Sequence, residues 1–150
     1  MEKDMTTTDR QHDEATIREL LGEWRDAVQR KDIEGVMANY APDMVGFDAW
    51  GDLRIDVDTY RDHWMQAFAG HDGPIHIEHH DVHLVVGDGV AFCRCLVNMG
   101  GTLQDGTQHS FWGRGTICFE KRGGRWLVTH EHASAPFDPM TGRACTDLTP

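Results

Sequence analysis

The sequence predicts a single α+β domain in which three helices come first and a curved, mostly antiparallel sheet follows. Apolar residues recur at helical spacing within residues 14–69, whereas residues 75–135 form four long strand-like runs separated by glycine-rich turns. Helices and strands segregated in this way are typical of α+β domains, with the helices packed on one face of the sheet. We expect residues 1–12 to be a disordered tail, residues 13–137 to form the domain, and residues 138–150 to be a second tail.

The first helix is predicted over residues 14–30. Its apolar residues form one stripe at three- and four-residue spacing: Ile17, Leu20, Leu21, Trp24, Ala27 and Val28. Asp32 then caps a short second helix over residues 33–40. Pro42 ends that helix, because the residue before a proline avoids helical geometry.

A short strand over residues 44–47 is predicted to end at Asp48, and a loop follows it. The third helix, over residues 57–69, is capped by Asp56 or Asp58. Aromatic side chains recur on it at four-residue spacing: Tyr60, Trp64 and Phe68. We therefore expect the inner face of this helix to be aromatic.

The remaining four strands are predicted over residues 75–86, 90–100, 107–121 and 125–135. Strands this long in a small domain must twist and bend. A sheet curled over three helices then forms a cone, whose interior is a pocket for a small apolar molecule. In the last strand, strict alternation places Trp126, Val128, His130 and His132 on one face and Glu131 on the other.

Charge and composition exclude several classes of partner. The formal net charge is −11, which argues against nucleic acid and anionic membranes as partners. No apolar run has the length of a membrane span, and the N-terminus lacks the apolar core of a signal peptide. The four cysteines include no CxxC pair, so we expect free thiols in a reducing compartment and a cytoplasmic protein.

The sequence also lacks the motifs of several reaction classes. It contains no GxSxG, no HExxH and no glycine-rich phosphate loop after a strand, which excludes hydride and phosphoryl transfer and leaves proton chemistry or binding. Alternation would place His79, Asp81 and His83 on one face of a strand. A metal site needs three converging ligands with supporting partners, so we favour a solvated polar strand and expect neither metal nor cofactor.

Four stretches carry a resemblance to a known family: KDIEGVMANYAPD, VGFDAWG, YRDHW and GRGTICFEKRGGRWLVTHEHASAPF. On these residues the chain resembles the SnoaL-like group of the nuclear-transport-factor-2-like (NTF2-like, cystatin-like) superfamily, close to ketosteroid-isomerase homologues. The resemblance implies a cone-shaped fold and cofactor-free isomerisation, dehydration or aldol cyclisation of an apolar carbonyl or hydroxyl compound. The alternative is a non-catalytic ligand-binding or dimerisation domain, because this fold hosts many functions.

The resemblance also directs attention to three candidate catalytic residues. Asp48 lies where the pocket is expected to open, and loss of hydration there would raise its pKa toward a range useful for proton transfer. The competing interpretation is that Asp48 only orders the following turn. For the last strand, which lines the pocket in similar proteins, we favour a proton-transfer role for His132 and a core role for His130. Arg114 either holds an anionic group or pairs with Asp48.

The remaining candidates are walls of the pocket and a contact surface. Aromatic residues are expected to line the pocket or to fill the core: Trp24, Trp50, Tyr60, Trp64 and Trp112. Tyr60 is in addition a candidate oxyanion donor. One face of the strand over residues 90–100 is uniformly apolar: Ala91, Cys93, Cys95, Val97 and Met99. If the helices cover the other face, a homodimer through the outer face of the sheet follows, as the resemblance also implies.

Overall fold

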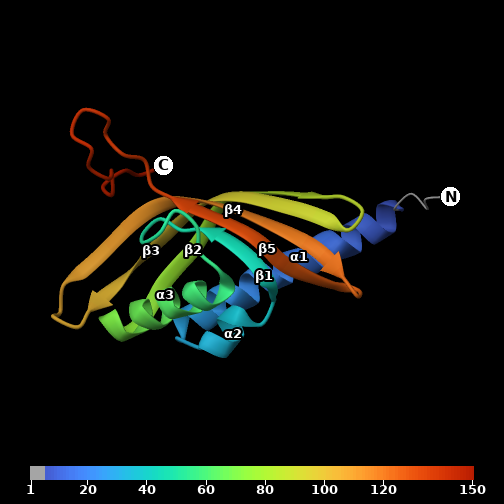
Figure 1. Ribbon diagram of the computed structural model, residues 1–150, viewed down its shortest axis with the longest axis horizontal. Helices are drawn as coiled ribbons and strands as arrows, with labels where there is room; N and C mark the ends of the chain where they lie inside the picture. The colour runs from blue at the N-terminus through green and yellow to red at the C-terminus, as the bar shows by residue number, and fades with distance from the viewer. Residues whose placement is uncertain (1–5) are drawn as a thin grey trace.

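The computed structural model describes residues 6–150, which form three helices and one five-stranded sheet. The elements are α1 (Thr7–Gln29), α2 (Ile33–Met37), β1 (Tyr40–Phe47), α3 (Val57–Gly70), β2 (His71–Val86), β3 (Val90–Leu103), β4 (Gln108–Arg122) and β5 (Arg125–Ser134). The strand order is β1-β5-β4-β3-β2, with only β1 and β5 parallel. This confirms the predicted α+β class with a mostly antiparallel sheet (Figure 1).

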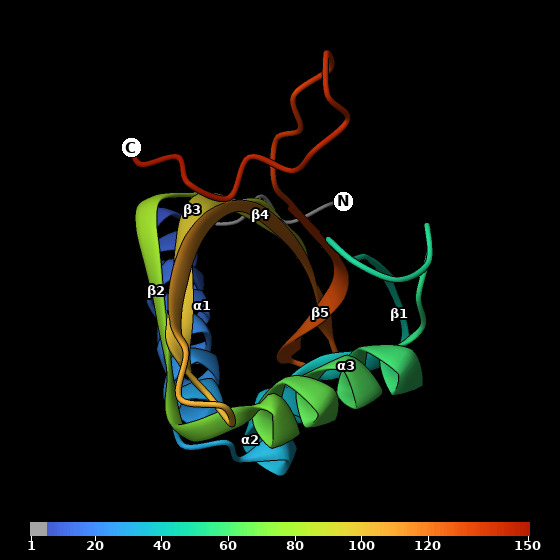
Figure 2. The ribbon, with the colours of Figure 1, turned by 90° about the vertical axis from the view of Figure 1, so that its left-hand side faces the viewer.

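The sheet is strongly curved, and the helices lie on its concave side (Figure 2). The helix α1 runs along β2, while α2 and α3 close the opening of the arch. Buried side chains from the helices and the concave face form two groups. One group is Ala27, Val28, Val36, Met44, Ile55, Tyr60, Phe68, Ile75 and Ile77, and the other is Ile17, Val86, Ala91, Cys93, Ile117, Phe119, Trp126 and Val128.

The helix α1 begins at Thr7, seven residues before the predicted start. Thr6 and Asp9 form a capping box, in which the amide of Asp9 donates to the Thr6 hydroxyl at 3.1 Å. Of the predicted N-terminal tail, residues 1–5 lie outside the described residues, and the helix covers the rest from Thr7 onward. Asp13 then ties the helix to the sheet, because it accepts from Lys121 Nζ at 2.8 Å and Trp126 Nε1 at 3.0 Å.

The apolar face of β3 is on the concave side, where the helices cover it. Ala91, Cys93 and Cys95 are buried there, so this face is not the exposed patch considered from the sequence. The convex face carries exposed apolar side chains of its own, including Phe92 on β3 and Phe47 on β1. Within residues 6–150 no helix is long and apolar enough to cross a membrane.

A bulge in β5 reverses the predicted faces of its second half. Phe119 on β4 pairs with Val128, but the preceding Cys118 pairs with His130, so Thr129 is an extra residue in β5. The predicted alternation therefore holds up to Val128 and is wrong after it. Beyond the bulge, Glu131 turns to the concave side and His130 to the convex side.

A second bulge, on β2, also reverses the predicted faces of the residues that follow it. The pairing register shifts between His80 and His83, and Asp81 adopts a positive φ of 51°. As a result His79 lines the interior of the domain, whereas His83 is exposed on the other side of the sheet. The expectation that His79, Asp81 and His83 share one face is wrong.

Candidate functional site

The concave side of the sheet encloses a cavity of about 160 Å³ beneath the loop that follows β1. Its walls are mainly apolar, with side chains from α1, α3 and the strands β2, β3 and β4: Trp24, Trp64, Ile77, Val97, Met99 and Ile117. Small residues on β4 and β5 leave the space open, among them Gly115 and Ala133. Four polar residues gather at the end nearest the loop: Asp48, Tyr60, His63 and Glu131.

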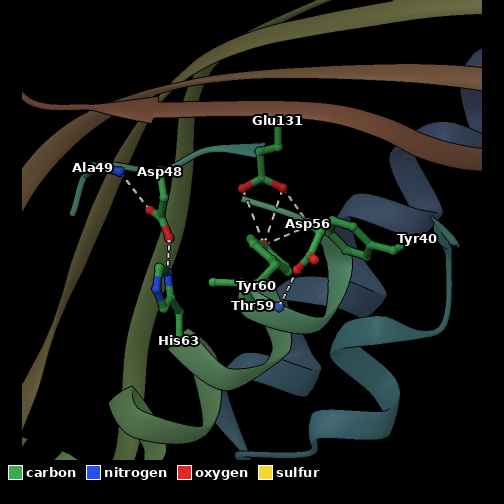
Figure 3. A network of polar contacts seen from close by, with 8 residues as sticks. All are labelled: Tyr40, Asp48, Ala49, Asp56, Thr59, Tyr60, His63 and Glu131. Atoms are coloured by element: carbon green, nitrogen blue, oxygen red, sulfur yellow. Dashed lines mark hydrogen bonds and ion pairs between the residues drawn. The ribbon is translucent and has the colours of Figure 1, made fainter. Parts of the chain in front are cut away.

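Glu131 lies on β5 and is the central polar residue of this end. Tyr40 Oη donates to Glu131 Oε2 at 2.5 Å, and Tyr60 Oη lies 3.2 Å from the same oxygen. The two tyrosine hydroxyls are themselves 2.8 Å apart. Tyr40 comes from β1 and Tyr60 from α3, so three elements converge on one carboxyl group (Figure 3).

The environment of Glu131 moves its pKa into the physiological range. Burial disfavours the charged form and, with a smaller contribution from the nearby Asp48 carboxylate, raises the pKa from 4.5 to about 7. The hydrogen bonds from Tyr40 and Tyr60 oppose this rise, because they stabilise the ionised carboxylate. Glu131 is therefore present in both protonation states near pH 7, as proton transfer at that pH requires.

Asp48 and His63 form a second pair at the mouth of the cavity. Asp48 Oδ2 is 2.7 Å from His63 Nδ1, and both side chains are 13% exposed. Asp48 Oδ1 accepts from the amide of Ala49 at 2.7 Å, which fixes the carboxylate. Since a carboxylate accepts the hydrogen bond, His63 carries a proton on Nδ1, and its neutral form has a lone pair on Nε2.

The loop after β1 covers this pair. The ring of Trp50 stacks on that of His63, with centroids 4.4 Å apart and planes inclined by 23°. Gly51 follows with a positive φ of 86°, and a Cβ atom there would lie 3.2 Å from His63 Cε1. Glycine is suited to this position because it adopts that conformation without strain and leaves room for the imidazole.

The Asp48–His63 pair lies next to Glu131 and its two tyrosines. Asp48, Tyr60 and Glu131 line one small gap beside the cavity, and Figure 3 shows both groups between α3 and β5. The site therefore combines a carboxyl group of raised pKa with an oriented imidazole, which is an acid and a base at one end of an apolar cavity. Among residues 6–150 no group of three or more His, Cys, Asp or Glu side chains is arranged to hold a metal ion.

The structure places five of the predicted site residues at this cavity. Asp48, Trp24, Trp50, Tyr60 and Trp64 all line it. The hydroxyl of Tyr60 is bonded to Glu131 and Tyr40, so it supports a carboxyl group in addition to facing the cavity.

Of the other four predicted residues, Arg114 lines the cavity, whereas His130, His132 and Trp112 do not, which corrects the pocket role expected for His132. His132 is exposed on the convex face and lies against Phe47, with ring centroids 5.7 Å apart. His130 Nδ1 is 2.7 Å from the carbonyl oxygen of Val45. The exposed guanidinium of Arg114 donates from Nε to Ser134 Oγ at 3.3 Å, so Arg114 reaches only the rim of the cavity.

Trp112 is the fourth of these residues, and it contacts His80 outside the cavity, with ring centroids 4.7 Å apart. Three residues of the site were missed in the sequence: Tyr40, His63 and Glu131. A signal existed for His63, which follows Tyr60 by three residues on α3 and therefore shares its face. For Glu131 the bulge at Thr129 hid the correct face.

The fold and the site define a class of protein: an NTF2-like cone with ionisable side chains in an apolar interior. A family model of the SnoaL-like domain matches residues 17–138. The chain belongs to this SnoaL-like family within the NTF2-like proteins. The comparison with curated proteins found no match.

Solved structures agree with this assignment. The chain is 34% identical to an NTF2-like protein of unknown function from Pseudomonas putida KT2440, with a TM-score of 0.85 over 93% of this chain and 98% of that one. A candidate dehydratase of the NTF2-like family from Streptomyces avermitilis is 17% identical, with a TM-score of 0.72 over 83% and 97%. The association domain of C. elegans CaMKII is also 17% identical, with a TM-score of 0.66 over 83% and 97%. The last two likenesses concern the fold.

Proposed function

We propose that this protein is a cofactor-free acid/base enzyme of the isomerase or lyase type that acts on a small apolar carbonyl or hydroxyl compound. The observation that carries the proposal is Glu131, a carboxyl group with a pKa of about 7 at the polar end of an apolar cavity. The Asp48–His63 pair beside it supplies a base at the same end. A candidate dehydratase among the structures with this fold is compatible with such chemistry.

In the proposed reaction, His63 Nε2 removes a proton from a carbon next to the substrate carbonyl. Asp48 orients the imidazole and stabilises the imidazolium that forms. Protonated Glu131 donates its proton to the substrate oxygen, and Tyr40 and Tyr60 stabilise the carboxylate that remains. If that oxygen is a hydroxyl on the neighbouring carbon, the C–O bond breaks, water leaves and a C=C bond forms. Solvent at the mouth then returns both groups to their starting states.

A second candidate function is ligand binding without chemistry. The observation that favours it is the pair of tyrosine hydroxyls on Glu131, because a carboxyl group with satisfied hydrogen bonds is also a stable structural element. Binding alone gives no reason for the oriented imidazole at the mouth, so we favour the enzyme.

Deuterium exchange tests the proposed chemistry without knowledge of the natural substrate. The protein is incubated in D₂O with cyclohexanone and 3-hydroxycyclohexanone, and proton NMR follows α-deuteration and dehydration. We expect α-deuteration to be faster with the native protein than in buffer alone. In Glu131→Gln the rate should fall to that of buffer. His83→Gln, on the exposed side of β2, is the matched control and should keep it. Exchange that is equal in the native protein and in Glu131→Gln contradicts the proposed role of Glu131.

The proposal includes a homodimer through the convex face of the sheet. Support comes from exposed apolar side chains on this face, namely Phe47, Val85 and Phe92. Sedimentation at micromolar concentration should give a dimer, and Phe92→Glu should give a folded monomer. A native protein that sediments as a monomer contradicts this part.

A cytoplasmic location also belongs to the proposal. All four cysteines are free thiols, as a reducing compartment would keep them: Cys93, Cys95, Cys118 and Cys145. Alkylation during cell lysis in denaturant should label all four, and disulfide-bonded cysteines, which alkylation does not label, would contradict the location.

A further inference from the structure

His79 lines the cavity from the wall opposite Glu131. It lies on β2, and the strand order β1-β5-β4-β3-β2 separates β2 from β5 by two strands. The curvature of the sheet brings β2 and β5 to opposite sides of the interior (Figure 2). Both side chains line the same cavity. The cavity therefore has a polar group at each of two opposite walls.

The imidazole of His79 has no hydrogen-bond partner within residues 6–150. Its ring lies beside that of Trp24, with centroids 5.5 Å apart, and the side chain is partly buried. Burial lowers its pKa, and the charges of Arg25 and His80 lower it further. The ring is therefore neutral at pH 7, with one nitrogen as donor and the other as acceptor. His79 also borders an outer groove between α1 and β2, so it forms part of the wall between groove and cavity.

The cavity has room for one ring. Its volume is about 160 Å³, and an apolar cavity of about 150 Å³ in another protein holds a single benzene molecule. The exposed guanidinium of Arg114 bonds to Ser134 at the rim of the cavity, while the carboxyl groups of Asp48 and Glu131 lie at its polar end. An anionic ligand would be repelled by these carboxylates, and its charge would lose hydration against the apolar walls.

From these observations we infer that His79 is a ligand-binding residue and that the preferred ligand is a single uncharged ring with oxygen substituents at opposite ends. One oxygen bonds to His79, and the other faces Glu131 and Tyr60. The placement of a ligand oxygen toward Glu131 rests on the proposed function. At the His79 end the inference rests on an imidazole without a protein partner at the cavity wall, to which a ligand oxygen can form a hydrogen bond.

Binding of small phenols tests the inference independently of turnover. Phenol, 1,4-benzenediol, 1,3-benzenediol and 2-naphthol are titrated into the protein under nitrogen, and NMR shifts give each Kd. We expect 1,4-benzenediol to bind about five-fold tighter than phenol and than its 1,3-isomer, as one additional hydrogen bond predicts. We expect 2-naphthol, with two rings, to bind at least about ten-fold more weakly than phenol, because overfilling a packed site is costly.

The preference for the second oxygen must depend on His79. His79→Phe should remove it, with 1,4-benzenediol and phenol binding within about two-fold of each other, while His79→Gln should restore part of it. His83→Phe, on the exposed side of the same strand, is the matched control and should retain the full preference. Equal binding of the two phenols by the native protein, or a preference that survives in His79→Phe, overturns the inference. An inactive protein that keeps the His79-dependent preference refutes only the proposed reaction.

Discussion

Glu131 and His132 are neighbours in the sequence, yet their environments are opposite. Glu131 faces the concave side, where two tyrosine hydroxyls contact it and burial raises its pKa to about 7. His132 faces the convex side, where it is exposed and lies against Phe47. The single extra residue Thr129 decides which of the two is inside. The pKa of Glu131 is raised because the bulge turns its side chain inward. The residue type alone does not predict this shift.

The largest effect in this comparison is expected for Glu131→Gln. The amide keeps the shape of the side chain but has no proton to transfer near pH 7, so turnover should fall by about 10² to 10⁴. Steady-state kinetics and a thermal melt of the same preparation check this result. A variant that is folded and fully active would remove Glu131 from the mechanism.

The next effect is on stability against pH. The pKa of Glu131 is raised in the folded state, so folded protein binds more protons and loses stability as pH rises from 4.5 to about 7. This shift corresponds to about 3 kcal/mol of unfolding free energy as an upper value. Urea unfolding at pH 5 and pH 8 should show this loss in the native protein and a smaller one in Glu131→Gln. An equal loss in both proteins would mean that other groups account for it.

Asp48→Asn should sharpen the contrast between the two halves of the site. The amide no longer enforces a proton on His63 Nδ1, so we expect turnover to fall by about two orders of magnitude with the fold intact. In His63→Gln we expect turnover to fall by a similar factor. In the double variant it should fall by little more than in either single variant, because the two residues act as a unit. Additive losses in the double variant would contradict this pairing.

A smaller effect is expected for Tyr60→Phe. Loss of this hydroxyl removes a hydrogen bond that stabilises ionised Glu131, so the pKa of Glu131 should rise further. If protonated Glu131 is the acid, activity falls as pH rises through about 7 in the native protein. In Tyr60→Phe, the pH at which activity falls should be higher than in the native protein. A pH profile of kcat/KM measures this shift. A fall in activity at lower pH than in the native protein would contradict the role of protonated Glu131 as the acid.

The smallest effect is expected for His132→Ala. Because His132 lies on the convex face, turnover per protomer should change by less than about two-fold. Arg114→Ala should behave in the same way. A loss of ten-fold or more in His132→Ala would reverse the comparison and restore the role predicted from the sequence.

The sequence predicted the fold well because its signals are local. Apolar spacing on α1 and α3, and the glycine-rich turns between the strands, need only neighbouring residues to be recognised. Asp48 was also found, since it directly follows a strand.

The centre of the site was not predictable in this way. Whether Glu131 faces inward depends on a bulge at Thr129, and bulges arise from the pairing of β5 with β4 rather than from the local pattern. Tyr40 was expected at the end of a helix and instead begins β1, which brings its hydroxyl to Glu131. Residues brought together by tertiary packing leave no mark in sequence spacing.

A ¹³C NMR titration of the glutamate side-chain carboxyl groups tests most directly whether the interior of this domain holds a proton donor that works at neutral pH. We predict one carboxyl signal with a midpoint near 7 in the native protein, and its absence in Glu131→Gln. A set of signals that all titrate below pH 5 would contradict the account.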